Sequence, residues 1–510
     1  MFKPITLYYA DGYKVGHKRM LAKGTKRLYG TWIPRSTKYA TGGITKILSF
    51  GQQLMIRWLH DEFKENFFEQ PKEVAVKFGV DMSKYLGLPY DASHFESLHD
   101  LGYLPIRIKS LPEGIETPVN IPHMTFINTV DDFGWLTLYL ETIISSLSWK
   151  PTTSATIALQ YRRNLVKWVM KTDPSNAWLI PYMAHDFSAR GLSPWDMLSS
   201  GLGHATSFRG SDTIIVIPAA RYFYDESEDE VCINSVNASE HSVSTTQIFT
   251  VGEEKMLDIW LDEFSEGILS VVMDTFDLTK VVKPGEGGIL YDLKEKIMNR
   301  NGKLVIRPDS GDPIEIICGR SNRELTKKDL TFEERSFYPE FYEKGLIECL
   351  WEIFGGTINE QGYKVLDPHI GAIYGDSINL ERQIKIYEGL EAKGFATTNI
   401  VLGVGSYTYQ ATTRDTLGWA AKGSWFEVEV EDVTGQLSRA GYDIYKDPAT
   451  DDGTKKSLKG FIMVDENLEV HTQCTIEQEA TGLLHTIYEN GVFYNKVTLS
   501  EIRARIEAIS

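Results

Sequence analysis

Acidic side chains and one histidine follow short apolar runs in the middle of the chain. Asp274 and Asp309 stand at or just beyond the ends of two such runs, and His241 has Glu240 as its neighbour. Carboxylate oxygens suit a hydrated Mg²⁺ ion, which commonly bridges to substrate phosphates. A carboxylate beside an imidazole raises its basicity and fixes its tautomer. These residue types predict a metal-linked, phosphorylated substrate and a histidine that Glu240 or Asp274 could orient.

Glycines at 375, 403 and 405 stand after two further apolar runs. Their backbone N–H groups could approach a phosphate closely, particularly where the loop opens a helix, although glycines alone indicate only tight turns. The chain contains no GxxxxGK[ST] loop, no HExxH and no GxSxG. P-loop phosphate chemistry, zinc proteolysis and serine hydrolysis therefore lack their motifs.

Six apolar runs must position these residues, and amphipathic segments follow several of them. The runs that we predict to be strands are 177–184, 204–208, 268–273, 303–306, 369–374 and 399–402. The pattern of 383–390 predicts a helix that ends near Gly394, and another helix is predicted from about 156 to 170. Alternating strands and helices indicate a parallel sheet, and this many units favour a closed barrel with its site at the carboxyl ends of the strands.

The composition is that of a folded enzyme rather than a nucleic-acid-binding or membrane protein. The chain has 510 residues, 42% of them apolar, and a net charge of 53 − 70 = −17. Such an acidic chain disfavours a nucleic-acid surface, so an anionic substrate needs a local basic cluster. No signal segment or membrane span is evident, and the four scattered cysteines suggest buried, reduced thiols. We therefore expect a soluble cytoplasmic protein.

The ordered set of motifs resembles that of nicotinamide phosphoribosyltransferases over nearly the whole chain. The motifs are D-G-Y-K-V at 11–15, G-W-L-T at 134–137, H-D-F-S-A-R-G at 185–191, G-S-D-T at 210–213, S-E-H-S at 239–242, R-P-D-S-G at 307–311, G-D at 375–376, T-R-D at 413–415, K-D-P at 446–448 and L-L-H-T at 483–486. The resemblance implies an α/β fold with an irregular (β/α) barrel and an additional β-rich domain. We expect a mixed, β-rich segment at 1–178, the catalytic barrel at 179–410, and a segment at 411–510 that completes the β-rich domain and the phosphate site.

The resemblance also implies how a pyridine base is bound. Phe187 and Tyr13 would sandwich the ring, with Tyr13 supplied by the partner subunit of a homodimer that shares its active sites. Arg307 would donate to the amide carbonyl, and Asp212 would accept from the amide NH₂. Arg190 would lie near the ring and the sugar phosphate. The substrates would be nicotinamide and phosphoribosyl pyrophosphate.

The remaining roles that the resemblance implies concern phosphate, metal and ATP. Asp309 and Asp376 would handle the ribose hydroxyls and the Mg²⁺–pyrophosphate region, with Asp309 as a metal ligand. ATP would phosphorylate His241, which Glu240 and Asp274 would orient. Further substrate contacts would come from Ser235, Gly375, Gly405 and Ser406, and positive charge for pyrophosphate and ATP from Arg35, Arg414, Lys422 and Lys446.

Two positions depart from the family pattern, and two other functions remain open. The glycine run expected before the Thr-Arg-Asp segment contains Ser406, and Ala420 replaces an expected serine. One alternative is nicotinate phosphoribosyltransferase, although Asp212 would repel a nicotinate carboxylate and would instead hydrogen-bond an amide NH₂. The other is a catalytically silent binding or signalling protein on the same scaffold.

Overall fold

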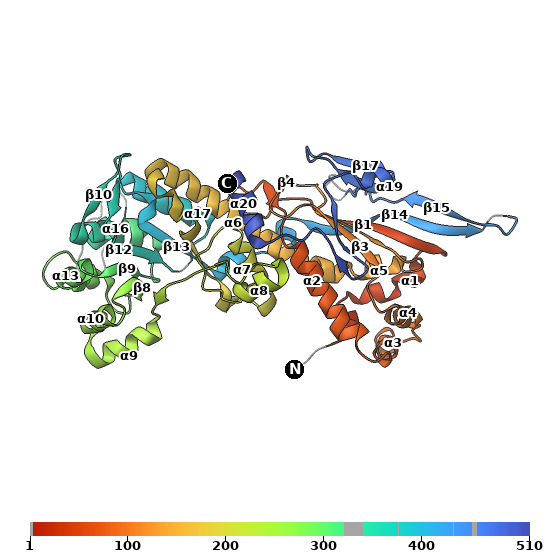
Figure 1. Cartoon of the computed structure of the whole chain (residues 1–510), viewed down its shortest axis with the longest axis horizontal. Coiled ribbons are helices and arrows are strands. Elements are labelled where there is room, and N and C mark those ends of the chain that lie inside the picture. Colours follow the sequence, from red (N-terminus) through yellow and green to blue (C-terminus); the bar gives the residue numbers. More distant parts are fainter. Residues whose placement is uncertain (1–3, 321–339, 376, 432, 451–455) are drawn as a thin grey trace. The chain divides into compact units, whose positions relative to one another are not determined.

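The computed structural model describes residues 4–320, 340–375, 377–431, 433–450 and 456–510. The chain forms two compact units. Unit 1 comprises Met1–Thr156, Pro218–Glu230 and Thr412–Ile509, and unit 2 comprises Ile157–Ile217, Val231–Ala411 and Ser510 (Figure 1). The predicted three-part division at 178/179 and 410/411 stays a prediction.

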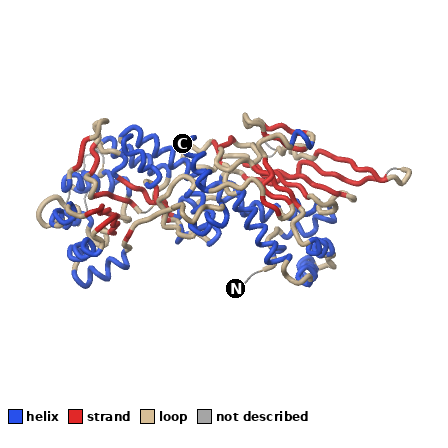
Figure 2. The backbone as a smooth tube through the Cα atoms, in the orientation of Figure 1, coloured by secondary structure: helices blue, strands red, loops and turns tan. Residues whose placement is uncertain are grey.

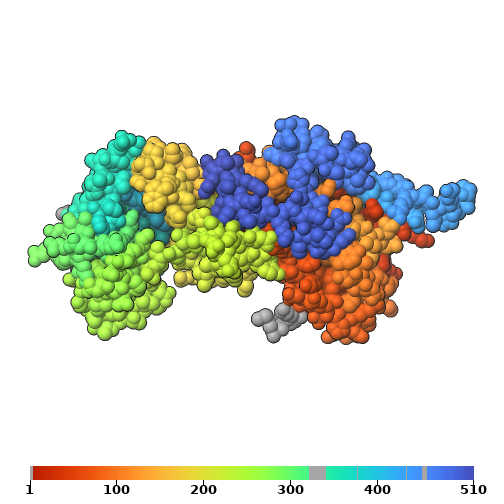
Figure 3. Space-filling view, viewed as in Figure 1, coloured from red at the N-terminus to blue at the C-terminus, as the bar shows by residue number. Residues whose placement is uncertain are grey.

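Unit 1 is built on an antiparallel sheet that the two ends of the chain share. Its strands lie in the order β15, β14, β1, β5, β3, β18, β19. Their bounds are β1 Thr25–Pro34, β3 Ile106–Ser110, β5 Met124–Asn128, β14 Trp419–Glu431, β15 Leu437–Asp443, β18 His485–Glu489 and β19 Val492–Phe493. β1 pairs with β14 from Thr25 opposite Val428 to Pro34 opposite Trp419. The β-rich domain expected from N- and C-terminal segments is therefore present, and Figure 3 shows the blue C-terminal atoms against orange N-terminal ones.

Aromatic side chains fill the centre of this sheet, and smaller elements surround it. The indoles of Trp32 and Trp419 stack with their centroids 3.7 Å apart. The other strands of unit 1 are β2 Lys46–Leu48, β4 Glu116–Pro118, β16 Phe461–Val464 and β17 Val470–Cys474. Its helical segments are η1 Thr6–Tyr8, η2 Gly12–Gly16, α1 His17–Met20, α2 Gln52–Phe63, η3 Lys64–Phe68, α3 Glu73–Leu86, α4 Ser93–Leu101, α5 Gly134–Tyr139, η7 Arg414–Thr416, α19 Ile476–Glu479 and α20 Leu499–Ile509. α6 Glu141–Thr172 and α8 Val216–Tyr224 contain residues of both units.

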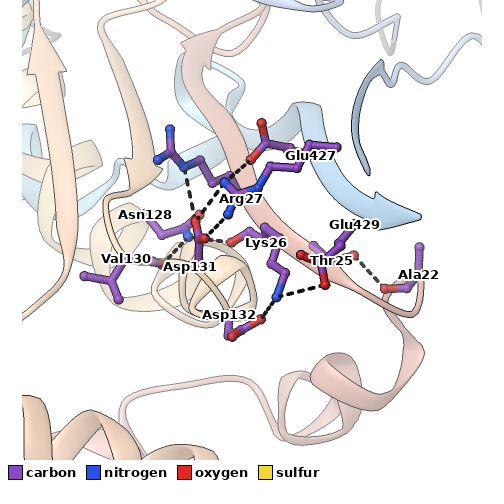
Figure 4. Close-up of polar contacts among 11 residues, drawn as sticks. Ala22, Thr25, Lys26, Arg27, Asn128, Val130, Asp131, Asp132, Glu427 and Glu429 are labelled. Atoms are coloured by element: carbon purple, nitrogen blue, oxygen red, sulfur yellow. Dashed lines mark hydrogen bonds and ion pairs between the residues drawn. The ribbon is translucent and has the colours of Figure 1, made fainter. Parts of the chain in front are cut away.

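The β14–β15 hairpin extends beyond the other strands of its sheet (Figure 2), and charged side chains cluster where it lies beside β1 and the segment that follows β5 (Figure 4). Lys26 Nζ lies 2.9 Å from Asp132 Oδ1, and the Asn128 amide donates to the Lys26 carbonyl at 2.8 Å. Arg439 on β15 donates to Glu427 at 3.2 Å and also pairs with Asp131. Exposed pairs of this kind contribute about 0–1 kcal/mol each, so they add little to the stability of the hairpin.

Unit 2 is an irregular parallel barrel, as the sequence predicted. The sheet runs in the order β6, β13, β12, β9, β8, β7, with every pairing parallel. The bounds are β6 Ala184–Phe187, β7 Asn237–Ala238, β8 Glu266–Val272, β9 Asn301–Arg307, β12 Ile370–Tyr374 and β13 Ile400–Gly405. Two isolated parallel bridges, Asp186–Ser211 and Gly210–Asn234, continue the pairing from β6 toward the segment that leads into β7. The sheet therefore curls round on itself.

Short helices connect the strands of unit 2. They are η4 Pro174–Tyr182, η5 Ala189–Gly191, α7 Pro194–Ala205, α9 His241–Val251, α10 Glu253–Glu263, α11 Leu278–Val281, α12 Ile289–Asp292, α13 Lys294–Met298, α14 Pro313–Cys318, α16 Phe341–Phe354, α17 Leu380–Ala392, η6 Thr397–Asn399 and α18 Ser406–Gln410, and a small hairpin is formed by β10 Gly356–Ile358 and β11 Lys364–Leu366. Gly394 adopts a left-handed conformation at φ +74°, which ends α17 where the sequence predicted. The predicted helix at 156–170 is confirmed as the C-terminal part of α6.

Two predicted strands are wrong. The run 177–184 is mostly the 3₁₀ helix η4, and the strand begins only at Ala184. Pro174 starts that helix, and Pro181 lacks the N–H that an interior strand position must donate. The run 204–208 covers the end of α7 and the loop after it. Ser193 caps α7 by accepting from the Asp196 N–H, and a short apolar run fits a buried helix as well as a strand.

The cysteines agree only partly with the prediction of buried thiols. Cys232, Cys318 and Cys349 are buried, whereas Cys474 is partly exposed. Burial raises the pKa of the Cys318 and Cys349 thiols to about 12, which keeps them protonated and unreactive. Among the residues with assigned structure, no helix combines the length and apolar character needed to cross a membrane.

Candidate active site

Three neighbouring segments of unit 2 bring one group of polar side chains to the end of β6. His185 and Phe187 are two residues apart on this strand and therefore share a face. The backbone N–H of Asp212 donates to the Asp186 carbonyl at 3.0 Å, so Asp212 lies beside the strand. Asn234 bridges to Gly210 and carries Ser235 to the same place. All of these side chains line a cavity of 670 Å³ that also contains Arg307.

Asp212 is held as a carboxylate by two donors. Its Oδ1 lies 2.9 Å from His185 Nε2 and accepts a hydrogen bond from the Ser235 hydroxyl. Burial alone would raise the pKa of this carboxyl, but the hydrogen bonds from His185 and Ser235, with the positive charge of Arg307, lower it overall. Asp212 is therefore ionised at neutral pH and presents an acceptor to the cavity.

Arg307 presents the matching donor. Its Nη2 donates to the Ser239 carbonyl at 2.8 Å, whereas its buried Nε has no hydrogen-bond partner among the described residues. Burial lowers the pKa of this guanidinium, although Asp309 and Asp212 oppose that shift. Asp212, an acceptor, and the Arg307 guanidinium, a donor, line one cavity and complement a group that both donates and accepts, such as a carboxamide.

An aromatic ring forms a wall of this site. The Arg307 guanidinium lies 5.8 Å from the centroid of Phe187, whose ring is 4.6 Å from that of His185. A Cβ at Gly403 on the adjacent strand β13 would lie 2.7 Å from the Phe187 ring. Glycine at 403 therefore serves to admit the aromatic side chain, which can stack on a planar base.

His241 and two aspartates form a second cluster at the strand ends of unit 2. His241 is the first residue of α9, and its Nε2 lies 3.0 Å from Asp274 Oδ1 and 3.9 Å from Asp309 Oδ1. Asp274 Oδ2 accepts from the backbone N–H groups of Asp309 and Ser310 at 2.9 and 3.0 Å. Asp274 is therefore an acceptor toward His241, which places the proton on Nε2 and leaves Nδ1 as the nucleophilic nitrogen. The Glu240 carboxylate has no recorded hydrogen bond within the described part of the chain.

One carboxylate of this second cluster suits a Mg²⁺ ion. Ligand atoms of His241, Asp274 and Asp309 lie within 4.8 Å of one another. Protein donors already occupy both oxygens of Asp274, whereas the Asp309 side chain is 33% exposed. Mg²⁺ is usually held by one or two carboxylates together with waters and substrate phosphates, and Asp309 offers such a carboxylate.

The other predicted residues of unit 2 lie at the same strand ends. Gly375 follows β12, and its missing Cβ would lie 3.5 Å from that of Asp309. Gly405 ends β13 opposite Phe187, and Ser406 begins α18. Arg190 is exposed in η5 and acts electrostatically on Arg307. Asp376 lies outside the described residues.

The predicted phosphate-binding cations belong to unit 1. Burial lowers the pKa of Lys422, and the positive charges of Arg35, Lys14 and Lys446 add to this effect, while Glu141 opposes it. Arg35, Lys422 and Lys446 therefore form one basic cluster, as an anionic substrate on an acidic chain requires. Arg414 pairs with Asp415 at 3.3 Å, and Tyr13, 65% exposed, belongs to the same unit.

Sequence reasoning missed His185. Its position two residues before Phe187 on a short strand was the available signal, since strand alternation places both on one face. The pairing with Asp212, however, joins residues 27 positions apart in the chain.

Comparisons with known proteins define the class to which this fold and site belong. Residues 182–492 match the profile described as the nicotinate phosphoribosyltransferase (NAPRTase) family. The chain belongs to this family. It is 41% identical to a nicotinamide phosphoribosyltransferase of Acinetobacter baylyi over 97% of this chain and 96% of that protein. It is 31% identical to a nicotinamide phosphoribosyltransferase of Xanthomonas campestris pv. campestris, over 83% of each chain.

Solved structures agree with the fold. The crystal structure of human nicotinic acid phosphoribosyltransferase has a TM-score of 0.50 at 15% identity, covering 98% of this chain and 92% of that one. A nicotinate-nucleotide pyrophosphorylase from Pyrococcus furiosus gives 0.51 at 14% identity, covering 98% and 94%. These likenesses concern the fold alone.

Proposed function

We propose that this chain is a nicotinamide phosphoribosyltransferase, which joins nicotinamide to phosphoribosyl pyrophosphate and releases nicotinamide mononucleotide and pyrophosphate in NAD biosynthesis. The proposal depends on one observation, which is that Asp212 and Arg307 line the same cavity. The aspartate accepts from the amide NH₂, and the arginine donates to the amide carbonyl. Phe187 stacks on the pyridine ring.

The same pairing favours nicotinamide over nicotinate. Nicotinate carries a carboxylate, which the ionised Asp212 repels and to which it cannot donate. A nicotinamide NH₂ gains a hydrogen bond to a charged acceptor, typically about 1.5–3 kcal/mol. The ordered His241–Asp274 contact argues against a catalytically silent scaffold, since it supplies a nucleophilic nitrogen that mere binding does not need.

In the transfer step, the pyridine nitrogen forms a bond to the anomeric carbon while the bond from that carbon to the pyrophosphate oxygen breaks. The pyrophosphate leaves with the electron pair, and the ring nitrogen becomes a cationic pyridinium. Positive charge develops on the sugar in the transition state, and a carboxylate such as that of Asp309 stabilises it electrostatically. When bound, Mg²⁺ neutralises charge on the leaving pyrophosphate, and Asp309 is the residue that would hold it.

We further propose that ATP drives the synthesis forward through His241. The free Nδ1 attacks the terminal phosphate of ATP, ADP leaves, and water later hydrolyses the phosphohistidine. Asp274 keeps the proton on Nε2 and stabilises the imidazolium character that develops. Arg35, Lys422 and Lys446 offer positive charge for the phosphates, and Arg414 supplies a further cation.

The proposal includes a cytoplasmic homodimer with shared active sites, in which the partner subunit supplies the tyrosine ring at position 13. The test is turnover of radiolabelled nicotinamide with phosphoribosyl pyrophosphate, with and without Mg²⁺–ATP, alongside radiolabelled nicotinate. Formation of nicotinamide mononucleotide supports the proposal. Turnover of nicotinate alone would assign the sister activity, and turnover of neither base would leave a binding protein.

A further inference from the structure

The Asp212 carboxylate has one oxygen engaged by the protein and one that is not. Oδ1 receives hydrogen bonds from both His185 Nε2 and the Ser235 hydroxyl. A carboxylate oxygen has two lone pairs, so two donors fill Oδ1. No hydrogen bond to Oδ2 is recorded from the residues that the structure describes. Oδ2 is therefore the oxygen available to a ligand in the cavity.

We propose that His185 is the positioning residue for base selection: by donating from Nε2 to Asp212 Oδ1, it orients the carboxylate so that Oδ2 faces the substrate amide. This inference rests on the proposed function and adds a residue that does not itself touch the base. Because Asp212 is an ionised acceptor, the shared proton lies on Nε2 of the imidazole. His185 therefore acts by fixing the orientation of the Asp212 carboxylate.

Three structural features position the His185 ring. Its backbone lies on β6 opposite Gly403 of β13, and its ring packs at 4.6 Å against Phe187. A Cβ at Gly210 would lie 3.0 Å from His185 Nδ1, so glycine at 210 lets the ring approach the bridging segment. The His185 side chain is only 12% exposed, compared with 42% for Asp212. The buried imidazole is thus the fixed partner, and the more exposed carboxylate is the one that it orients.

The second donor to Asp212, the Ser235 hydroxyl, fixes its direction less strictly than the imidazole does. Ser235 lies on a segment with no regular secondary structure, and its hydroxyl can rotate about one bond. A planar imidazole fixed between Phe187 and Gly210 can donate in one direction only. Loss of His185 would leave Asp212 free to turn, and the amide would lose a preorganised acceptor.

The experiment compares His185→Ala with His185→Gln in kinetics with both bases. We expect His185→Ala to lower kcat/KM for nicotinamide about tenfold. The change should appear mainly as a higher KM, because the hydrogen bond from the amide to Asp212 is equally strong in the ground state and in the transition state. The ratio of nicotinamide to nicotinate kcat/KM should fall by a similar factor. The Gln side chain retains a donor of similar reach, so His185→Gln should keep the ratio within about threefold of the unsubstituted protein.

The matched control is His471→Ala. His471 Nε2 lies 2.9 Å from Asp465 in unit 1, which is the same spacing as in the His185–Asp212 pair, and it is not among the residues lining the cavity. This variant should leave KM and the ratio unchanged. Thermal unfolding monitors folding, and if His185→Ala does not fold, His185→Asn replaces it, since its amide has a shorter reach.

The outcomes separate the two claims. If the unsubstituted protein does not turn over nicotinamide, the proposed function fails whatever the variants do. If it does, and His185→Ala or His185→Asn keeps both the nicotinamide KM and the ratio, the positioning role is overturned. An equal loss of kcat for both bases without a change in ratio also overturns it, since that result means general structural damage.

Discussion

Nε2 of His241 lies 3.0 Å from Oδ1 of Asp274, while the other oxygen of that aspartate accepts two backbone N–H groups. The aspartate cannot turn away from the histidine without breaking those two hydrogen bonds. The imidazole is thereby held in one tautomer at the beginning of α9, with Nδ1 as the free nitrogen.

Incubation with Mg²⁺–ATP should place an acid-labile phosphate on His241. In Asp274→Asn, the amide can still accept from the two backbone donors but no longer supplies a negative charge to the imidazole, so the phosphorylated fraction should fall at least about tenfold. Intact-mass analysis at alkaline pH measures this fraction. Glu240→Gln is the matched control and should label normally, because among the described residues it is Asp274, and not the Glu240 carboxylate as the resemblance implied, that hydrogen-bonds His241. Equal labelling of Asp274→Asn would refute the orienting role of Asp274.

Asp212→Asn should change the choice of base. The variant loses a charged acceptor for the amide NH₂, which costs about 1.5–3 kcal/mol, or roughly tenfold to a hundredfold in kcat/KM for nicotinamide. It also removes repulsion of nicotinate and adds a donor, so kcat/KM for nicotinate should rise. Kinetics with both bases measure the effect. If the ratio of kcat/KM for nicotinamide to that for nicotinate did not change, Asp212 would not be the residue that recognises the amide.

Subunit exchange between two inactive variants should restore activity if the sites are shared. Tyr13→Ala removes a ring from unit 1, and Asp309→Ala removes a carboxylate from unit 2, so a hybrid dimer contains one intact site. After subunit exchange, each hybrid dimer should have up to about half of the activity of an unsubstituted dimer, because one of its two sites is intact. Each variant incubated alone is the control. No recovery, despite exchange verified by mass, would show that each subunit has a complete site of its own.

Stability should depend on pH through Glu253 at the beginning of α10. Burial raises the pKa of this carboxyl from 4.5 to about 7, with Asp277 and Asp274 adding to the effect and Lys280 opposing it. A raised folded-state pKa means that its stabilising contribution is complete below pH 4.5 and is lost as the pH rises through about 7. Because Glu253 is only partly buried and solvent screens its charge, ionisation of this carboxyl destabilises the fold by about 1–2 kcal/mol.

Glu253→Gln should therefore raise the free energy of unfolding above that of the unsubstituted protein at pH 8, and should match it at pH 4.5. Urea unfolding at both pH values measures the difference. Glu254→Gln, at the exposed neighbouring position, is the control and should change neither value. A Glu253→Gln variant with the same relative stability at both pH values would contradict the shifted pKa.

The sequence by itself determined the barrel and most of the strand ends that carry chemistry. The runs at 268–273, 303–306, 369–374 and 399–402 correspond to β8, β9, β12 and β13, because buried parallel strands are near-continuous apolar segments. The ordered motifs identified Asp212, His241, Arg307 and Asp309 as candidate site residues, because a motif consists of residue types and spacings that can be recognised without the tertiary structure.

Tertiary structure decided what the local pattern left ambiguous. The run at 204–208 contains the end of α7, because five residues are too few to show a periodicity that separates a buried helix from a strand. The pairing of β1 with β14 and the contact between His185 and Asp212 join positions far apart in sequence. Such contacts depend on how sheets close and register, which is fixed by the packing of the whole unit and not by any short segment of the chain.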